Sequence, residues 1–369
     1  MNDTLKILHI NSQTSWGGGE SQTLALVRGL MECGQENILF CKSSGELALR
    51  AGKTGIPAVH LPFRGEFDIY SALRLRAYVK RRGVNIVHAH EAHAHTTAFL
   101  ALLGLDSCRL VVSRRVAFPL RSRFSRKIKY SNVVKKIIAV SDAVRNSLIA
   151  EGIEPERIVV IRDGFSPVNL EMSGTIAEPR QAFGLTGEQV VISTVGSLTS
   201  NKAHLVLLHA AHILVKKHPE AIFLFAGEGE MRPRIESEIR RLRLEKHVRL
   251  LGFREDIATV YRASDIYAVS SREEGLCSSI LEAMYFRLPV AATNTGGIPE
   301  LVRHGVNGYL SPVNDPETLA EYLLTLIENP EKRREMGEQS AVLAEQNRME
   351  NTVEKTLAVY RSLLEDYYE

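Results

Sequence analysis

The stretch Glu274-Gly-Leu-Cys-Ser-Ser-Ile-Leu-Glu282 places two carboxylates eight residues apart, the first beside a glycine and the second inside a predicted helix. Free N–H groups at the start of a helix bind anions such as phosphates. A carboxylate on each side can then accept hydrogen bonds from hydroxyl groups. The stretch is therefore typical of a site for a sugar nucleotide, while a capped, solvent-exposed helix start in any α/β protein is the alternative.

Short apolar runs alternate with segments of helical periodicity on both sides of this stretch, which is the pattern of parallel sheets with crossover helices. Strands around it are predicted at Val190–Val195, Ile222–Ala226, Val248–Leu251, Ile266–Val269 and Pro289–Thr293. In the first half they are predicted at Leu5–Ile10, Glu36–Phe40, Ala58–Leu61, Asn85–His88, Arg109–Ser113, Lys136–Val140 and Ile158–Ile161. The chain is therefore predicted to be an α/β protein with two parallel sheets.

The length of 369 residues exceeds what one hydrophobic core usually supports. A loop-rich stretch between Gly164 and Glu188 separates the two sets of strands. We predict one Rossmann-like domain at residues 1–170, a second at residues 171–345, and a C-terminal helix at residues 346–369 that packs back on the first domain. Ligands of such sheets bind beyond the carboxyl ends of the strands, so we expect two facing domains with a cleft between them.

The composition favours a cytoplasmic protein. No apolar run approaches the roughly 20 residues that a membrane span needs, and the first residues do not have the pattern of a signal peptide. The four cysteines have neither CxxC nor Cys/His metal spacing, so we expect reduced thiols and no metal site built on them.

Positive charge is concentrated in the first half of the chain. Residues 1–170 contain 24 Lys or Arg against 14 Asp or Glu, whereas residues 171–369 contain 22 against 29, and the whole chain has a net charge of +3. The basic stretch 109–136 has no acidic residue and contains interleaved apolar residues such as Phe118 and Leu120. It is predicted to receive an anionic partner, a phospholipid or a lipid-linked acceptor, with a solvated surface as the alternative. No nucleic-acid-binding motif accompanies it.

Several glycine turns follow predicted strands. The loop that contains Gly17, Gly18 and Gly19 lets backbone N–H groups approach an anion. It does not match the GxGxxG pattern, so a nicotinamide dehydrogenase is disfavoured. The segment from Gly196 to Lys202 lacks the P-loop pattern, and its lysine is predicted to lie beside phosphates at the Glu274 loop. The turns at Gly227 and before Phe253 can supply backbone groups to a nucleotide base. The alternative for the glycine loops is an ordinary tight turn, and the alternative for Lys202 is a surface lysine.

His88 and His90 end a predicted strand, where alternation directs both rings to one face. Three interpretations remain open. The first is a metal site, although Cys and carboxylate partners at suitable spacing are missing. The others are structural histidines, or a ring at the cleft edge that forms a hydrogen bond with a substrate hydroxyl or a main-chain carbonyl.

Taken together, these residues resemble the family 4 glycosyltransferases, retaining enzymes of the GT-B fold, over essentially the full chain. The resemblance rests on the loop at 17–20, His88-Ala-His90, Asp163-Gly164, Val195-Gly196 with Lys202, Gly227-Glu-Gly229, Leu251-Gly252, Glu274 to Glu282 with Ala283-Met284, and Gly296-Gly297. The order and spacing of these elements make the match specific for the family but not for a sugar.

The resemblance implies a role for each matching residue. Gly18 and its neighbours would donate N–H groups to the leaving diphosphate, and Lys202 would neutralise it. Glu274 would bind the donor sugar, with His90 beside the transferred sugar, and Glu282 would bind the ribose. The amides of Gly275, Leu276 and Cys277 would complete the phosphate site, and Phe253 with its neighbours would line the base. Ser197 and Gly227 are also expected to bind the donor nucleotide.

The implied reaction moves a sugar from a nucleoside diphosphate sugar to an acceptor hydroxyl with retained configuration, without a cofactor or metal. The acceptor is expected to be a lipopolysaccharide or another cell-surface glycan, anionic and lipid-linked, which would place the protein on the inner face of the plasma membrane.

One departure from the family pattern is Ser197, because an arginine is usual at this position. Arg162, Arg254 and Arg272 are candidates to replace its charge. The absent arginine favours one alternative, a non-catalytic sugar nucleotide binder. An epimerase or a phosphorylase of the same two-domain shape is another.

Overall fold

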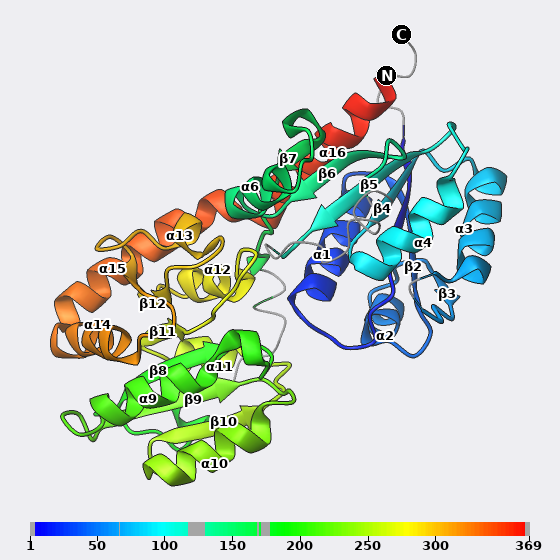
Figure 1. Cartoon of the computed structure of the whole chain (residues 1–369). Coiled ribbons are helices and arrows are strands. Elements are labelled where there is room, and N and C mark those ends of the chain that lie inside the picture. The colour runs from blue at the N-terminus through cyan, green and yellow to red at the C-terminus, as the bar shows by residue number, and fades with distance from the viewer. Residues whose placement is uncertain (1–3, 66, 117–129, 168–169, 171–177, 366–369) are drawn as a thin grey trace. The chain divides into compact units, whose positions relative to one another are not determined.

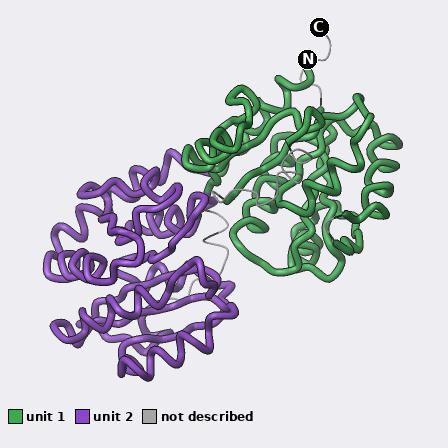
Figure 2. Tube along the Cα trace, in the orientation of Figure 1, with its two compact units in different colours: residues 1–164, 349–369 green, residues 165–348 purple. Residues whose placement is uncertain are grey.

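The computed structural model describes residues 4–65, 67–116, 130–167, 170 and 178–365 (Figure 1). The chain forms two compact units (Figure 2). Unit 1 contains residues 1–164 and 349–369, and unit 2 contains residues 165–348. Each unit has its own parallel sheet with helices, which confirms the predicted α/β class.

Unit 1 has a seven-stranded parallel sheet in the order β3-β2-β1-β4-β5-β6-β7 among its described residues. Its strands are β1 Lys6–Asn11, β2 Glu36–Lys42, β3 Ala58–Leu61, β4 Ile86–Ala89, β5 Arg109–Arg114, β6 Val134–Ala139 and β7 Ile158–Val160. Its helices include α1 Gly18–Glu32, α2 Glu46–Lys53, α3 Ile69–Arg82, α4 Ala92–Leu102 and α6 Asp142–Ala150. The strand order reverses between β1 and β4, so the loops after these two strands meet where ligands of such sheets bind.

Unit 2 has a six-stranded parallel sheet in the order β10-β9-β8-β11-β12-β13 among its described residues. Its strands are β8 Val190–Val195, β9 Ala221–Ala226, β10 Val248–Gly252, β11 Ile266–Val269, β12 Val290–Thr293 and β13 Gly308–Ser311. Its helices include α8 Pro179–Ala182, α9 His204–Leu214, α10 Arg232–Leu242, α11 Ile257–Ala263, α12 Ser278–Tyr285, α13 Ile298–Leu301, α14 Pro316–Glu328 and α15 Pro330–Ala344. The sequence predicts the first five strands but not β13. The strand order of this sheet reverses between β8 and β11.

Burial explains the strand composition. Every residue of β9 is buried, because helices cover both faces of a parallel sheet and only apolar side chains fit there. Phe223 and Phe225 belong to the main core of unit 2, which includes residues of α9, α10 and α14.

The last helix, α16 Met349–Glu365, belongs to unit 1 and packs against α1. Val353 lies so close to Gly29 that a β-carbon there would be 2.5 Å from its Cγ2 atom. The Tyr360 hydroxyl is buried and lies 2.6 Å from Nδ1 of His88. None of the helices in the described part of the chain combines the length and the hydropathy that a membrane crossing needs.

Candidate functional site

The loop between β11 and α12 places Glu274 at the edge of the second sheet. α12 begins after Cys277, a non-glycine residue in the left-handed region with φ 74°. Within the described part of the chain, no side chain caps this helix start. The N–H groups of its first turn are therefore not used by a described capping side chain, and their role in binding an anion stays a prediction.

The turn after β12 holds this loop from the other side. Gly296 has φ +53°, and a β-carbon at this position would lie 1.8 Å from the carbonyl oxygen of Glu274. The Thr293 hydroxyl donates to the carbonyl of Ser271 at 2.6 Å, and the Thr295 hydroxyl donates to the carbonyl of Arg272 at 2.9 Å. The backbone position of Glu274 is thus fixed by a close contact that only glycine permits.

Lys202 and Glu274 are in direct contact. The ammonium group of Lys202 donates to Oε1 of Glu274 at 2.5 Å, and the Ser271 hydroxyl donates to the same oxygen at 2.6 Å. The two side chains are 23% and 9% exposed. Burial alone would lower the pKa of Lys202, but the interactions with Glu274 and Cys277 outweigh this effect and raise the pKa. The lysine therefore stays charged at neutral pH.

Cys277 is a buried thiol rather than a reactive one. Burial raises its pKa to about 12, so it carries no charge at neutral pH. Its backbone, together with Gly275 and Leu276, forms the loop that leads into α12.

The loops after β8, β9 and β10 are joined at the same edge of the sheet. A β-carbon at Gly227 would lie 1.8 Å from the carbonyl oxygen of Gly196, and the N–H of Gly227 donates to the carbonyl of Gly252 at 2.8 Å. Ser197 and Phe253 follow these contacts and are exposed, Phe253 by 51%. The structure thus places Ser197, Gly227 and Phe253 on adjoining loops, with one aromatic ring open to solvent.

Glu282 lies in the second turn of α12 and accepts a hydrogen bond from the Tyr261 hydroxyl at 2.8 Å. Burial raises the pKa of Glu282 from 4.5 to about 6. Because the folded protein binds this proton more tightly than the unfolded chain, the stabilising contribution is complete below pH 4.5 and is lost as the pH rises through about 6. At neutral pH the carboxylate is ionised and is a hydrogen-bond acceptor.

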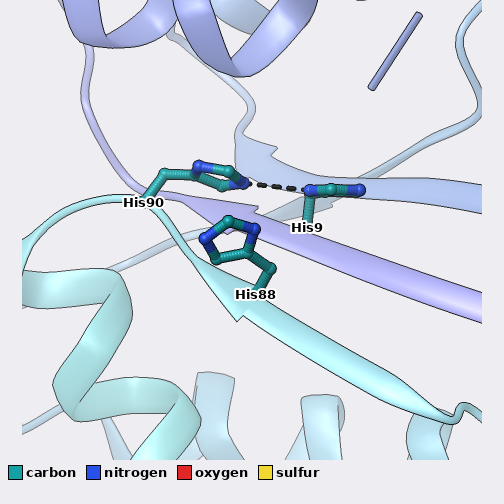
Figure 3. A group of neighbouring side chains, drawn as sticks. All are labelled: His9, His88 and His90. Carbon is teal, nitrogen blue, oxygen red and sulfur yellow. Dashed lines mark hydrogen bonds between the residues drawn. The ribbon is translucent and has the colours of Figure 1, made fainter. Parts of the chain in front are cut away.

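Three buried histidines meet at the β1–β4 reversal in unit 1 (Figure 3). Nδ1 of His9 lies 2.9 Å from Nε2 of His90, and Nε2 of His9 lies 3.0 Å from Oδ1 of Asn37. His88 contacts the Tyr360 hydroxyl through Nδ1 and the Ser113 hydroxyl, at 2.8 Å, through Nε2. Burial lowers the pKa of all three rings, that of His9 to about 4, so they are neutral at pH 7.

The partners fix the tautomers of His9 and His90. Nδ2 of Asn37 donates to the carbonyl of Gln35 at 2.9 Å, and a carbonyl only accepts, so Oδ1 of Asn37 must face His9. His9 therefore carries its proton on Nε2 and accepts at Nδ1, and His90 carries its proton on Nε2. Nδ1 of His90 is then a buried acceptor, and it has no hydrogen-bond partner among the residues that the structure describes.

Ligand atoms of these three histidines lie within 4.8 Å of one another, close enough for a metal ion. However, both nitrogens of His9 and His88 and Nε2 of His90 already have partners in the protein. A metal would have to break the His9–His90 contact, so the arrangement favours a hydrogen-bond relay that ends at His90.

Sequence reasoning missed the charged groups beside His90. Nε of Arg115 donates to Asp163 at 3.3 Å, and its Nη1 donates to the carbonyl of His90 at 3.2 Å. A β-carbon at Gly19 would lie 3.8 Å from Cδ of Arg115. Glu20, in the first turn of α1, is buried, and burial raises its pKa. The glycine loop that includes Gly17 and Gly18 therefore has both a guanidinium and a carboxyl group close to it.

The three arginines considered as replacements at Ser197 are engaged elsewhere. Arg162 donates to Asp142 at 2.8 Å, and Arg254 forms an ion pair with Asp256. Arg272 donates to Oδ1 of Asn314 at 2.7 Å and to the carbonyl of Ser200 at 3.2 Å.

The basic stretch 109–136 is described only at its ends. Residues 117–129, which include Arg121, Arg123, Arg126 and Lys127, lie outside the described residues. Of the described part, Lys136 donates to the carbonyl of Glu156 at 2.7 Å and Arg109 to that of Asp106 at 2.7 Å.

Comparison with known proteins places this site in context. Residues 16–167 match the family model described as Glycosyltransferase Family 4, and residues 175–342 match that of Glycosyl transferases group 1. An uncharacterized glycosyltransferase of Haemophilus influenzae is 33% identical over 169 residues, 46% of this chain and 48% of the relative. A UDP-Gal:alpha-D-GlcNAc-diphosphoundecaprenol alpha-1,3-galactosyltransferase of Escherichia coli is 27% identical over 79% of this chain and 80% of the relative.

The similarity to the Haemophilus protein and to a putative glycosyltransferase of Bacillus subtilis spans only about half the length of each, 48% and 49%. Among solved structures, HepE of Anabaena in complex with UDP-glucose matches with a TM-score of 0.86 and 22% identity, over 97% of this chain and all of that one. This likeness shows that the fold is GT-B, as the sequence predicts.

Proposed function

Because the chain belongs to the family 4 glycosyltransferases, we propose that it transfers a sugar from a nucleoside diphosphate sugar to an acceptor hydroxyl, with retention of configuration at the anomeric carbon. The observation that carries the proposal is the 2.5 Å contact between Lys202 and Glu274 beside the uncapped start of α12. A fixed cation, oriented N–H groups and a carboxylate are the groups that a phosphate-linked sugar needs.

The donor would be held mainly by unit 2. Lys202 and the amides of Gly275, Leu276 and Cys277 would bind the diphosphate. Glu274 would accept hydrogen bonds from the sugar hydroxyls, and the ionised Glu282 from the ribose. Phe253, which is 51% exposed, offers a face on which a base can stack. A uridine nucleotide is a reasonable first donor, since HepE was crystallised with UDP-glucose.

In the proposed reaction the bond between the anomeric carbon and the diphosphate oxygen breaks while the acceptor oxygen forms a bond to the same carbon. The acceptor attacks on the face that the diphosphate leaves, and its proton passes to a diphosphate oxygen. Lys202 and the start of α12 would stabilise the charge that develops on the leaving group, so the proposal includes no metal and no cofactor besides the donor.

His90 would contact the reacting sugar through Nδ1, because this nitrogen can accept a hydrogen bond and no described residue donates one to it. Gly17, Gly18 and Gly19 would contribute N–H groups to the diphosphate, and Arg115 would add a positive charge near Gly19.

The acceptor is proposed to be an anionic, lipid-linked glycan of the cell surface, handled at the inner face of the membrane. The Escherichia coli relative is named for an acceptor on diphosphoundecaprenol, a lipid carrier. Residues 1–170 contain 24 basic against 14 acidic residues, and this positive balance suits an anionic acceptor.

A direct test measures free nucleoside diphosphate after mixing the protein with UDP-glucose and other sugar nucleotides, with and without detergent-dispersed lipid diphosphate sugars. We expect nucleoside diphosphate to appear faster when the acceptor is present. Donors that raise the melting temperature without any acceptor-dependent release would instead support a non-catalytic binder, the alternative favoured by Ser197.

The pKa of Glu282 gives a pH prediction. The affinity for UDP should fall about tenfold between pH 7 and pH 5, because protonation below about pH 6 removes the carboxylate that accepts from the ribose. Isothermal titration calorimetry of UDP binding to the wild type and to Glu282→Gln measures this change in affinity. The phosphate groups of UDP titrate in both proteins, so the difference between the two pH profiles isolates Glu282. Parallel profiles would exclude Glu282 from the ribose site.

A further inference from the structure

Apolar side chains gather on the surface around the start of α3. Among the described residues, nine large apolar side chains are strongly exposed, and four of them lie within residues 67–73. These are Phe67, Ile69, Tyr70 and Leu73, which are 57%, 66%, 50% and 61% exposed. Single exposed apolar residues are ordinary, but a contiguous group on a soluble protein marks an interaction surface.

Packing within unit 1 does not account for this group. The inner face of α3 is already formed by Ala72, Leu75 and Val79, which are buried. The helix start is held by Asp68, whose side chain accepts from the N–H of Ser71 at 3.0 Å. The exposed residues therefore contribute little to the fold of unit 1, and another role is expected for them.

Positive charge surrounds the apolar group. α3 contains Arg74, Arg76, Lys80, Arg81 and Arg82 and no acidic residue. The guanidinium carbons of Arg64 and Arg74 lie 5.7 Å and 6.0 Å from the centroid of the Tyr70 ring. Arg74 also donates to the Tyr70 hydroxyl at 3.3 Å. The apolar side chains are thus bordered by cations that remain on the surface.

Helix α4 lies beside α3 (Figure 1). Nη1 of Arg76 donates to the carbonyls of Ala101 and Leu103, each at 2.8 Å. Leu103 is 55% exposed. The end of α4 therefore adds a fifth apolar side chain, next to α3.

We propose that the exposed face of α3, with Phe67 and Leu103, docks on the surface of an anionic phospholipid bilayer. The apolar side chains enter the boundary between headgroups and acyl chains, and the basic residues of α3 contact the phosphates. The inference deepens the proposed function, because it names the surface that would bring the enzyme to a lipid-linked acceptor. It uses a different part of the chain from the basic stretch 109–136.

Charge decides between a bilayer and a second copy of the chain. A symmetric contact between two copies of this face would oppose five cations with five cations, which disfavours it. Anionic lipid headgroups complement the same charges, at about fivefold in affinity for each basic residue near the surface.

The test uses the full chain and sedimentation with vesicles. We expect binding to vesicles that contain phosphatidylglycerol and much weaker binding to pure phosphatidylcholine. The variant I69S/L73S should bind phosphatidylglycerol vesicles at least about tenfold more weakly, because two apolar side chains no longer enter the bilayer. Leu49→Ser and Val342→Ser are matched controls, since both side chains are 61% exposed but lie outside the surface, and they should bind like the wild type.

Charge and association are tested in the same assay. The variant K80Q/R81Q/R82Q should also bind more weakly and depend less on salt, because three of the five basic residues of α3 are removed. Wild-type protein that ignores anionic vesicles, or an I69S/L73S variant that binds like the controls, would overturn the proposal. So would a wild type that elutes as a dimer while this variant elutes as a monomer, because a second copy would then cover the surface.

Two further measurements separate this inference from the proposed function. Melting curves show whether I69S/L73S is folded, and its donor-induced stabilisation and its transfer to a detergent-dispersed acceptor should equal those of the wild type. Vesicle binding without any transfer by the wild type would contradict the proposed function alone.

Discussion

Replacing Lys202 with methionine should lower kcat by about 100- to 1,000-fold, the usual effect of removing a group that stabilises developing charge. Methionine keeps most of the length of the side chain and loses the ammonium that lies 2.5 Å from Glu274. The leaving diphosphate would then lack its fixed cation in unit 2. Initial rates at saturating donor and acceptor, measured as nucleoside diphosphate release, give the effect.

The same change has a consequence for stability that must be separated from catalysis. Glu274 is 9% exposed, and without Lys202 its carboxylate keeps the Ser271 hydroxyl as a partner but has no cation beside it. Removing one member of a buried ion pair destabilises a protein because the other charge stays buried. The double variant K202M/E274Q leaves no such charge, so it should recover much of the melting temperature while activity stays low.

A surface lysine supplies the control. Lys217 is exposed and lies outside the site, so Lys217→Met should retain wild-type kcat. If Lys202→Met lowers kcat by less than about tenfold while Lys217→Met has no effect, then Lys202 does not stabilise the leaving group, and the proposed mechanism fails at its central step.

The sequence predicts most of the fold because the relevant signals are local. Buried strands such as β9 are runs of apolar residues, and the alternation with helices indicates parallel sheets without any further information. β13 is missed because Gly308–Ser311 is short and contains a glycine and a serine, so it does not stand out from the surrounding loop. The prediction of a helix after Glu274 rests on the same local signals.

The candidate site is less predictable because its geometry depends on contacts between distant residues. The tautomer of His90 is set by His9, 81 residues earlier, and by Asn37, which lies beyond His9. Arg115 is one of many basic residues in the stretch 109–136, and only the fold brings it to Asp163 and to Gly19. Periodicity and composition contain no information about such pairs.

The exposed face of α3 illustrates the same limit. The apolar residues of α3 lie on more than one side of the helix, so periodicity alone does not show which side faces the core. Only the structure shows that Ala72 and Val79 are buried while Ile69 and Leu73 are exposed. The basic stretch attracts attention in the sequence, whereas this surface becomes visible only after folding.

Gly296→Ala should destabilise unit 2 by about 3 kcal/mol or more and abolish donor binding, since the space for a methyl group does not exist. The added carbon would lie 1.8 Å from the carbonyl oxygen of Glu274 and 2.8 Å from its carbonyl carbon. Both are backbone atoms, so no side-chain rotation relieves the overlap. The loop that holds Glu274 must move, and with it the contact to Lys202.

Gly305→Ala separates this overlap from the general effect of a left-handed backbone. Gly305 has φ +79°, compared with +53° for Gly296, and a β-carbon there would meet no atom of the described residues within 4 Å. Both substitutions therefore incur about 1–2 kcal/mol of backbone strain, and only Gly296→Ala adds the collision. The excess should lower the melting temperature of Gly296→Ala further than that of Gly305→Ala, by about 2–4 °C per kcal/mol for a unit of this size.

Donor binding gives the second readout. Gly305→Ala should keep the stabilisation by UDP, and Gly296→Ala should lose it even at temperatures where it remains folded, because the displaced segment is the one that positions Glu274 and the start of α12. Equal melting temperatures for the two variants, together with equal responses to UDP, would show that this segment adapts freely. The close contact at Gly296 would then have no part in forming the site.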